Sequence, residues 1–123
     1  MKDSVKKISI IIVNYNAGEY IKSCLQSLED VKKEIDFEIF VVDNASEDQS
    51  IEEIKKRFPK VNYILNDENL GFGKANNQAM RLAKSEYILL LNPDSKVLPG
   101  TIKAMVDFMD QNLEVGAASC RVE

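Results

Sequence analysis

Short apolar runs and amphipathic segments alternate along the chain. Five runs of β-branched and aliphatic residues predict strands buried in a sheet; they are Ile8–Val13, Phe37–Val42, Val61–Leu65, Tyr87–Leu91 and Val115–Ser119. Between them, apolar residues spaced three and four apart predict helices; they are Ile21, Cys24, Leu25 and Leu28, then Ile51, Ile54 and Phe58, then Phe72, Ala75, Ala79 and Leu82, then Ile102, Met105, Val106 and Met109. The alternation predicts an α/β fold, a Rossmann-like and mostly parallel sheet with helices on both faces.

Length and composition narrow the class of protein. The chain has 123 residues, which predicts one domain over 1–123. It contains no histidine, and this excludes Ser-His-Asp hydrolysis and His-ligated zinc. Its net charge of −4 argues against nucleic acid as a partner, because phosphates need a basic surface. Cys24 and Cys120 lack the spacing of a zinc site, so we expect core thiols in a soluble, cytoplasmic domain.

Polar residues directly follow the first four predicted strands. They are Asn14, Tyr15 and Asn16, then Asp43, Asn44 and Ser46, then Asn66, Asp67 and Glu68, then Asn92, Asp94 and Ser95. Open α/β sheets bind ligands at the carboxyl ends of their strands, so we expect a binding site at this edge. For any single position, helix capping or turn formation is the more ordinary explanation. Four such loops together favour a site.

The standard phosphate-binding motifs are absent. The segment Gly71-Phe72-Gly73-Lys74-Ala75 resembles a phosphate loop, but a Walker A motif needs glycine where Glu68 stands and Ser or Thr where Ala75 stands. A dinucleotide fingerprint needs a third glycine where Asn76 stands, and its glycines should follow the first strand. A response regulator needs an acidic pair after the first strand, where Val13-Asn14 stands.

Four ordered motifs carry a resemblance to a known family. They are Ile10-Ile11-Ile12-Val13-Asn14-Tyr15-Asn16, then Val41-Val42-Asp43-Asn44-Ala45-Ser46-Glu47-Asp48, then Asn69-Leu70-Gly71-Phe72-Gly73-Lys74-Ala75-Asn76-Asn77, then Leu90-Leu91-Asn92-Pro93-Asp94. Together they resemble the family 2 glycosyltransferases, in particular the bacterial branch with rhamnosyltransferases and related cell-surface polysaccharide enzymes. The resemblance extends from about Ile8 to Arg121.

The resemblance implies a glycosyltransferase A fold whose N-terminal half binds a nucleoside diphosphate-sugar. By the family's motifs, Asp43 would hydrogen-bond a pyrimidine base, and Val13, Asn14 and Tyr15 would form the rest of the base pocket. Asp94 matches the last acid of the family's DXD motif, which holds Mg²⁺ or Mn²⁺ against the donor diphosphate. Asn92 replaces the first acid of that motif. The expected nucleotide-sugar site consists of Val13, Asn14, Tyr15, Asp43, Asn44, Gly71, Asn76, Asn92 and Asp94.

The implied activity is inverting transfer of the sugar to a glycan or lipid-linked acceptor in cell-surface polysaccharide synthesis. Family members carry the catalytic base in their C-terminal half, so we expect the base and the acceptor part beyond residue 123, in a fold truncated at its C-terminus. The resemblance is compatible with peripheral association of the full-length protein at the inner face of the membrane. Two alternatives are a nucleotide-binding module without transfer activity and a nucleotidyltransferase. A nucleotidyltransferase requires a Gly- and Lys/Arg-rich loop after the first strand, which this chain lacks.

Overall fold

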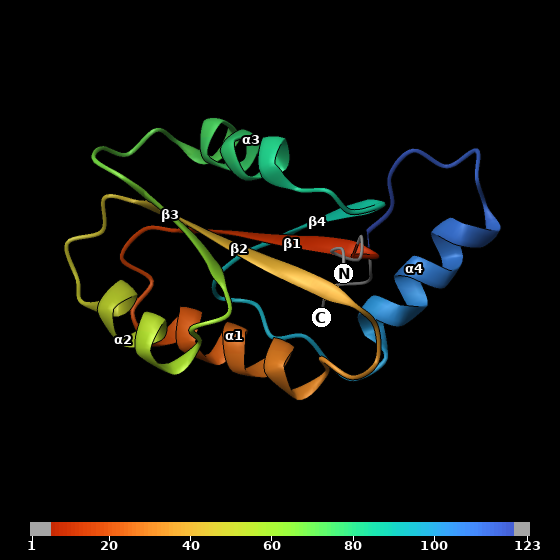
Figure 1. Ribbon diagram of the computed structural model, residues 1–123, viewed down its shortest axis with the longest axis horizontal. Helices are drawn as coiled ribbons and strands as arrows, with labels where there is room; N and C mark the ends of the chain where they lie inside the picture. Colours follow the sequence, from red (N-terminus) through yellow and green to blue (C-terminus); the bar gives the residue numbers. More distant parts are fainter. Residues whose placement is uncertain (1–5, 120–123) are drawn as a thin grey trace, which may run out of the picture.

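The computed structural model describes residues 6–119 as one parallel sheet with helices on both faces. In chain order the elements are β1 (Ile8–Asn14), α1 (Glu19–Asp30), β2 (Phe37–Asn44), α2 (Ser50–Arg57), β3 (Asn62–Asn66), α3 (Phe72–Leu82), β4 (Tyr87–Leu91) and α4 (Thr101–Gln111). The strand order is β3-β2-β1-β4. Helix α3 covers one face, and α1 and α2 cover the other (Figure 1). The predicted α/β class and the helices on both faces are confirmed.

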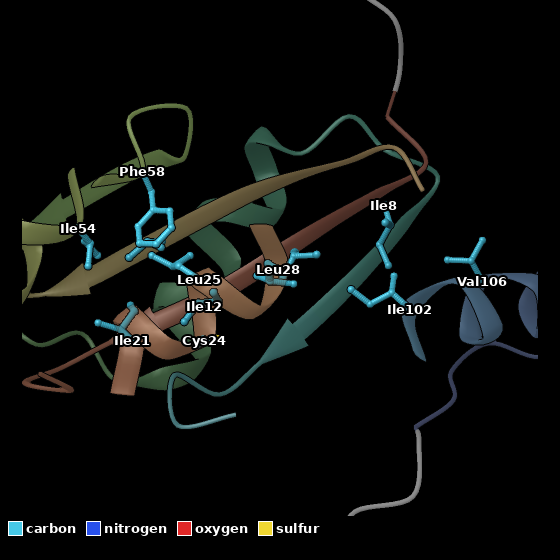
Figure 2. Close-up of a cluster of buried hydrophobic side chains, with 12 residues drawn as sticks. Ile8, Ile12, Ile21, Cys24, Leu25, Leu28, Ile54, Phe58, Ile102 and Val106 are labelled. Atoms are coloured by element: carbon cyan, nitrogen blue, oxygen red, sulfur yellow. The ribbon is translucent and has the colours of Figure 1, made fainter. Parts of the chain in front are cut away.

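The pleat of β1 divides the core between the two faces of the sheet. Ile8, Ile10 and Ile12 belong to one apolar cluster with residues of α1 and with Ile54 of α2. Within this cluster Ile12 lies toward α1, and Ile8 lies toward Ile102 (Figure 2). Ile11, the intervening residue, packs instead against Ala75 and Ala79 of α3. Because successive strand residues point to opposite faces, an unbroken apolar run is what a central strand requires. The strand is therefore anchored from both sides.

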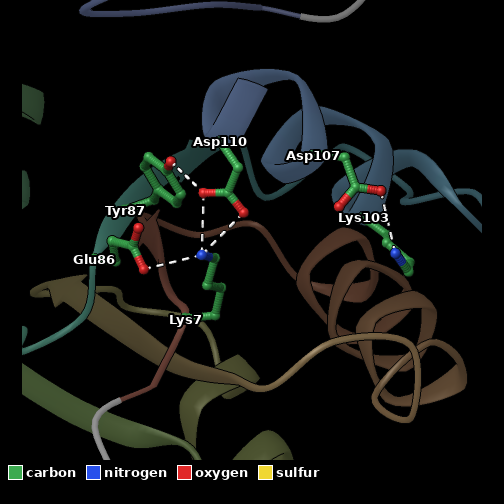
Figure 3. Close-up of polar contacts among 6 residues, drawn as sticks. All are labelled: Lys7, Glu86, Tyr87, Lys103, Asp107 and Asp110. Carbon is green, nitrogen blue, oxygen red and sulfur yellow. Dashed lines mark hydrogen bonds and ion pairs between the residues drawn. The ribbon is translucent and has the colours of Figure 1, made fainter. Parts of the chain in front are cut away.

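Helix α4 lies at the end of the sheet where β1 begins. Ile102 and Val106 of α4 belong to the same apolar cluster as Ile8 (Figure 2). Nearby, Lys7 Nζ contacts Glu86 at 2.9 Å and Asp110 at 3.0 Å, and the Tyr87 hydroxyl donates to Asp110 over 2.6 Å (Figure 3). The hydrogen bonds from Tyr87 and Lys7 lower the pKa of Asp110.

The predicted fifth strand is wrong. Residues 115–119 form no strand, although several of them line a hollow beside β4 and α4. The physical reason is their composition, because Gly116, Ala117 and Ala118 bring little side chain to pack on a pleated surface. The bounds of three predicted strands also change: β1 and β2 continue through Asn14 and Asn44, and β3 spans Asn62–Asn66.

Candidate functional site at the carboxyl ends of the strands

The carboxyl ends of the described strands meet at one edge of the sheet because all the pairings are parallel. The loops after β1, β2 and β3 lie together at the left of Figure 1. In the register, Asn14 of β1 lies beside Asp43 of β2, and Asn44 lies beside Asn66 of β3. These side chains therefore stand on strand backbone, which fixes their direction more firmly than a free loop would.

Asp43 is the centre of a hydrogen-bond network on the face covered by α1 and α2. Its Oδ1 accepts from Asn14 Nδ2 at 2.9 Å and from Ser46 Oγ at 2.6 Å, and its Oδ2 accepts from the Ser46 backbone N–H at 3.0 Å. The residue is only 7% exposed. A carboxylate offers about four acceptor positions, so Oδ2 keeps capacity for a further donor.

Asn14 is fully buried beside this carboxylate. Its Nδ2 group lies 3.3 Å from Ser46 Oγ and 3.2 Å from Ser50 Oγ, in addition to its bond to Asp43. Its Oδ1 has no hydrogen-bond partner among the residues that the structure describes. An unpaired buried acceptor is costly, by roughly 1–3 kcal/mol. Asn14 thus directs its donor group toward Asp43 at the expense of its own carbonyl oxygen.

The loop after β1 is tied to the loop after β2. Asn16 Oδ1 accepts from the backbone N–H groups of Glu47 at 2.7 Å and Asp48 at 3.1 Å, and the Asn16 N–H donates to Ser46 Oγ at 2.9 Å. The Gly18 N–H donates to Asp48 Oδ2 at 3.1 Å. Sequence reasoning gave no role to these contacts. The sequence signal for these contacts was the abundance of Asn, Asp and Ser in the two loops, since such side chains readily form hydrogen bonds with nearby backbone groups.

Tyr15 is carried on the first of these loops. It is 51% exposed, although its neighbours Asn14 and Asn16 are both fixed by the contacts described above. An exposed aromatic ring on a held backbone can stack on a planar ligand. The Tyr15 ring is therefore accessible to a ligand, as the base pocket implied by the resemblance requires.

A second group of predicted residues lies on the opposite face, under α3. Asn44 Nδ2 donates to the Gly71 carbonyl at 3.2 Å, and Asn44 Oδ1 accepts from Asn66 Nδ2 at 3.0 Å. Gly71 has a φ of 85°, in the region that favours glycine. Asn76 is 4% exposed, donates to the Phe72 carbonyl at 3.0 Å, and has an Oδ1 without a partner in the described part of the chain. Val13 also packs on this face.

The structure thus sorts the predicted residues into separate groups. Asn14 and Asp43 form one hydrogen-bonded unit, with Tyr15 next to it. Asn44 and Gly71 form another, and they hold the start of α3 to the end of β2. The two groups lie on opposite faces because consecutive strand residues alternate.

Asn92 and Asp94 belong to the loop after β4, and both are exposed. Helix α1 holds this loop: Cys24 Sγ donates to the Asn92 carbonyl at 3.8 Å, and the Val97 N–H donates to Ser27 Oγ at 2.9 Å. Burial, together with a smaller contribution from the charge of Asp94, raises the pKa of the Cys24 thiol to about 12. Cys24 is therefore a buried, neutral thiol, as predicted, whereas Cys120 lies outside the described residues.

Residues 6–119 contain no cluster of three or more His, Cys, Asp or Glu side chains arranged to hold a metal ion. Asp94 can supply one carboxylate ligand. Hard divalent cations accept a single protein carboxylate when substrate phosphates and water complete the shell. This donor set fits a cation held jointly with a diphosphate.

Two hollows described in the structure lie away from these residues. One, of about 570 Å³, is lined by the start of β2 with parts of α1 and the segment before β3, and the other, of about 330 Å³, lies beside β4 and α4. None of the predicted site residues lines either hollow. Among the described residues, no helix combines the length and apolar character needed to span a membrane.

Comparison with known proteins decides the family. The model of the family described as "Glycosyl transferase family 2" matches residues 9–123. The chain belongs to glycosyl transferase family 2. The resemblance read from the four motifs is confirmed at the level of the family, and its rhamnosyltransferase branch stays a prediction.

Two similar proteins are named as glycosyltransferases of poly(ribitol-phosphate). The chain is 33% identical over 111 residues to the poly(ribitol-phosphate) β-N-acetylglucosaminyltransferase TarS of Staphylococcus aureus, covering 86% of this chain and 19% of that protein. It is 36% identical over 112 residues to the poly(ribitol-phosphate) β-glucosyltransferase of Bacillus spizizenii, covering 86% and 18%.

A solved structure supports the fold assignment. TarS 1–349 in complex with UDP-GlcNAc superposes with a TM-score of 0.74 and 33% identity, over 87% of this chain and 32% of that one. The glycosyltransferase A fold is thereby confirmed for the part present. The chain spans 13–39% of the length of the curated relatives it matches.

Proposed function

We propose that this chain is the donor-binding part of an inverting glycosyltransferase, which moves a sugar from a nucleoside diphosphate to a hydroxyl on a glycan or lipid-linked acceptor. The observation that carries the proposal is the buried Asp43 carboxylate at the end of β2, held in place by Asn14 and Ser46. Family membership and the likeness to poly(ribitol-phosphate) glycosyltransferases support the reaction class and a role in cell-surface polysaccharide synthesis.

Asp43 would bind the nucleotide base. The imide N–H of a uracil or thymine ring can donate a hydrogen bond to a carboxylate oxygen. Oδ2 of Asp43 can accept one more such bond in addition to that from the Ser46 N–H. Tyr15, exposed next to Asn14, would stack on the ring. Asn14 would act through Asp43, since its amide is fully buried and bonded to that carboxylate.

Asn44, Gly71 and Asn76 would act indirectly. The bond from Asn44 to the Gly71 carbonyl fixes the turn into α3, and the Asn76 side chain is buried in that helix. Their place on the α3 face favours holding the loop of residues 67–71 in position near the donor. Val13 contributes apolar packing under the same helix.

Asp94 would hold a divalent cation against the donor diphosphate, and Asn92 would offer an amide to the ribose or to water. Family 2 enzymes typically use such a cation. Bound Mg²⁺ or Mn²⁺ would neutralise the charge that develops on the departing diphosphate. For its part, the chain holds the Asp94 loop to α1 through Cys24 and Ser27.

The likeness to TarS supports a uridine nucleotide as the nucleotide part of the donor, because the TarS structure that superposes on this chain contains UDP-GlcNAc.

The test is calorimetric titration of the chain with UDP and dTDP, with and without Mg²⁺. We expect binding that Mg²⁺ strengthens, and we expect Asp94→Asn to abolish that strengthening. Asp107→Asn, which removes an exposed carboxylate on α4, away from the carboxyl ends of the strands, is the matched control and should leave the response to Mg²⁺ intact. Failure of both nucleotides to bind, with or without Mg²⁺, would contradict the proposal.

A further inference from the structure

Asn16 combines two features that set it apart from the other loop residues. Its φ is 50°, in the left-handed region, which costs most L-residues roughly 1–2 kcal/mol and which Asn and Asp tolerate best. In that conformation its side chain accepts from two consecutive backbone N–H groups of the neighbouring loop, those of Glu47 and Asp48. The residue type thus meets a backbone requirement and a hydrogen-bonding requirement at once.

The contacts of Asn16 lead directly to the groups that would bind the base. Its backbone N–H donates to Ser46 Oγ, and the same hydroxyl donates to Asp43 Oδ1 at 2.6 Å. On its other side, Asn16 follows Tyr15 in the chain. One residue therefore connects the ring expected to stack on the base with the carboxylate expected to accept a hydrogen bond from the imide N–H.

We infer that Asn16 is a positioning residue for nucleoside recognition, which locks the loop of residues 15–18 to the loop of residues 45–49 before any ligand arrives. The inference rests on the proposed function. A site ordered in advance binds more tightly, because the entropy of ordering the loops is not lost at the moment of binding. No described hydrogen bond links Asn16 to the loop of Asp94, so its influence should stop at the nucleoside.

Three variants separate the contributions of Asn16. Asn16→Gly keeps the backbone conformation and removes the acceptor, whereas Asn16→Asp keeps both. Asn62→Ala is the matched control, since the Asn62 side chain also hydrogen-bonds to the backbone, in its case by donating to the Ile39 carbonyl, but at the far end of β3. The probes are uridine, which carries no phosphate, and UDP with and without Mg²⁺.

We expect Asn16→Gly to weaken the binding of uridine and of UDP by the same factor. The factor is about tenfold if the loss of loop ordering costs about 1.4 kcal/mol of binding free energy. Asn16→Asp should bind within about twofold of the unaltered chain. The ratio of UDP affinity with and without Mg²⁺ should not change in either variant, and Asn62→Ala should match the unaltered chain throughout.

A measurement on the unaltered chain keeps the test independent of the folding of any variant. Amide hydrogen exchange at Glu47 and Asp48 should be slow before uridine is added and should stay at the same rate afterwards. Fast exchange that slows only with uridine would overturn the inference, as would equal uridine affinity in Asn16→Gly. In both cases the proposed function would stand, whereas failure of the unaltered chain to bind uridine or UDP would overturn both.

Discussion

Replacing Asp43 with asparagine tests whether the network at the end of β2 has the energetic role that its geometry implies. The carboxylate accepts hydrogen bonds from Asn14 Nδ2, Ser46 Oγ and the Ser46 N–H. An amide in the same place has one oxygen and one NH₂ group. In either orientation its NH₂ group faces an existing donor, the Ser46 N–H or the Asn14 amide.

The magnitude follows from these contacts. A buried N–H left without an acceptor costs roughly 1–3 kcal/mol, and the remaining bonds lose the strengthening that a charged acceptor provides. We therefore expect Asp43→Asn to lower the free energy of unfolding by about 2–4 kcal/mol. The free energy of unfolding of a domain is typically about 5–15 kcal/mol, so the variant should remain folded.

Urea unfolding followed by far-ultraviolet circular dichroism measures this loss. Asp67→Asn makes the same chemical change at an exposed position and should alter the free energy of unfolding by less than about 0.5 kcal/mol. Equal unfolding free energies for the two variants would refute the reasoning, because the Asp43 bonds would then contribute nothing beyond an exposed carboxylate.

Three further predictions concern stability and activity. Burial raises the pKa of Tyr63 to about 12 from an unfolded value near 10.0. The neutral hydroxyl therefore stabilises the fold below pH 10, and this contribution is lost as the pH rises toward 12. In Tyr63→Phe, urea unfolding should show a smaller decrease in the free energy of unfolding over this pH range. Ala45 has a φ of 59°, so Ala45→Gly should leave the thermal midpoint unchanged or raise it, and a clear decrease would contradict the assigned backbone. The 123 residues alone should bind the donor and give no acceptor-dependent transfer of radiolabelled sugar, because transfer needs a base positioned at the acceptor hydroxyl and the proposed role of Asp43 and Asp94 is on the donor side.

A buried thiol provides a fifth prediction, specific to the loop that carries Asp94. Cys24 should resist thiol reagents in the folded chain, since burial raises its pKa to about 12 and the thiolate is the reactive form. In a Cys120→Ser background, modification should speed up only in denaturing urea. Rapid modification of the folded chain would show that the contact between α1 and the Asn92 carbonyl opens readily.

The apolar pattern predicted the sheet and its helices well, because a central strand such as β1 must be apolar on both faces. It placed the ends of β1 and β2 too early, since Asn14 and Asp43 are polar yet satisfy each other across the strands. It predicted a strand over Val115–Ser119 that does not form, because β-propensity depends on side chains that can pack.

Which site residues act together was harder to predict. Strand alternation alone could have separated Asp43 from Asn44, as they occupy successive positions of β2. The contact of Asn16 with Glu47 and Asp48 joins positions 31 and 32 residues apart. Only the relative placement of the two loops shows that contact, and no local pattern encodes it.

Amide chemical-shift mapping of the ¹⁵N-labelled chain with UDP tests the central claim most directly. The account predicts the largest shifts at Asn14, Tyr15 and Asp43, with those at Asn92 and Asp94 growing when Mg²⁺ is added. Shifts confined to α4, or to the residues that line the hollow at the start of β2, would contradict it.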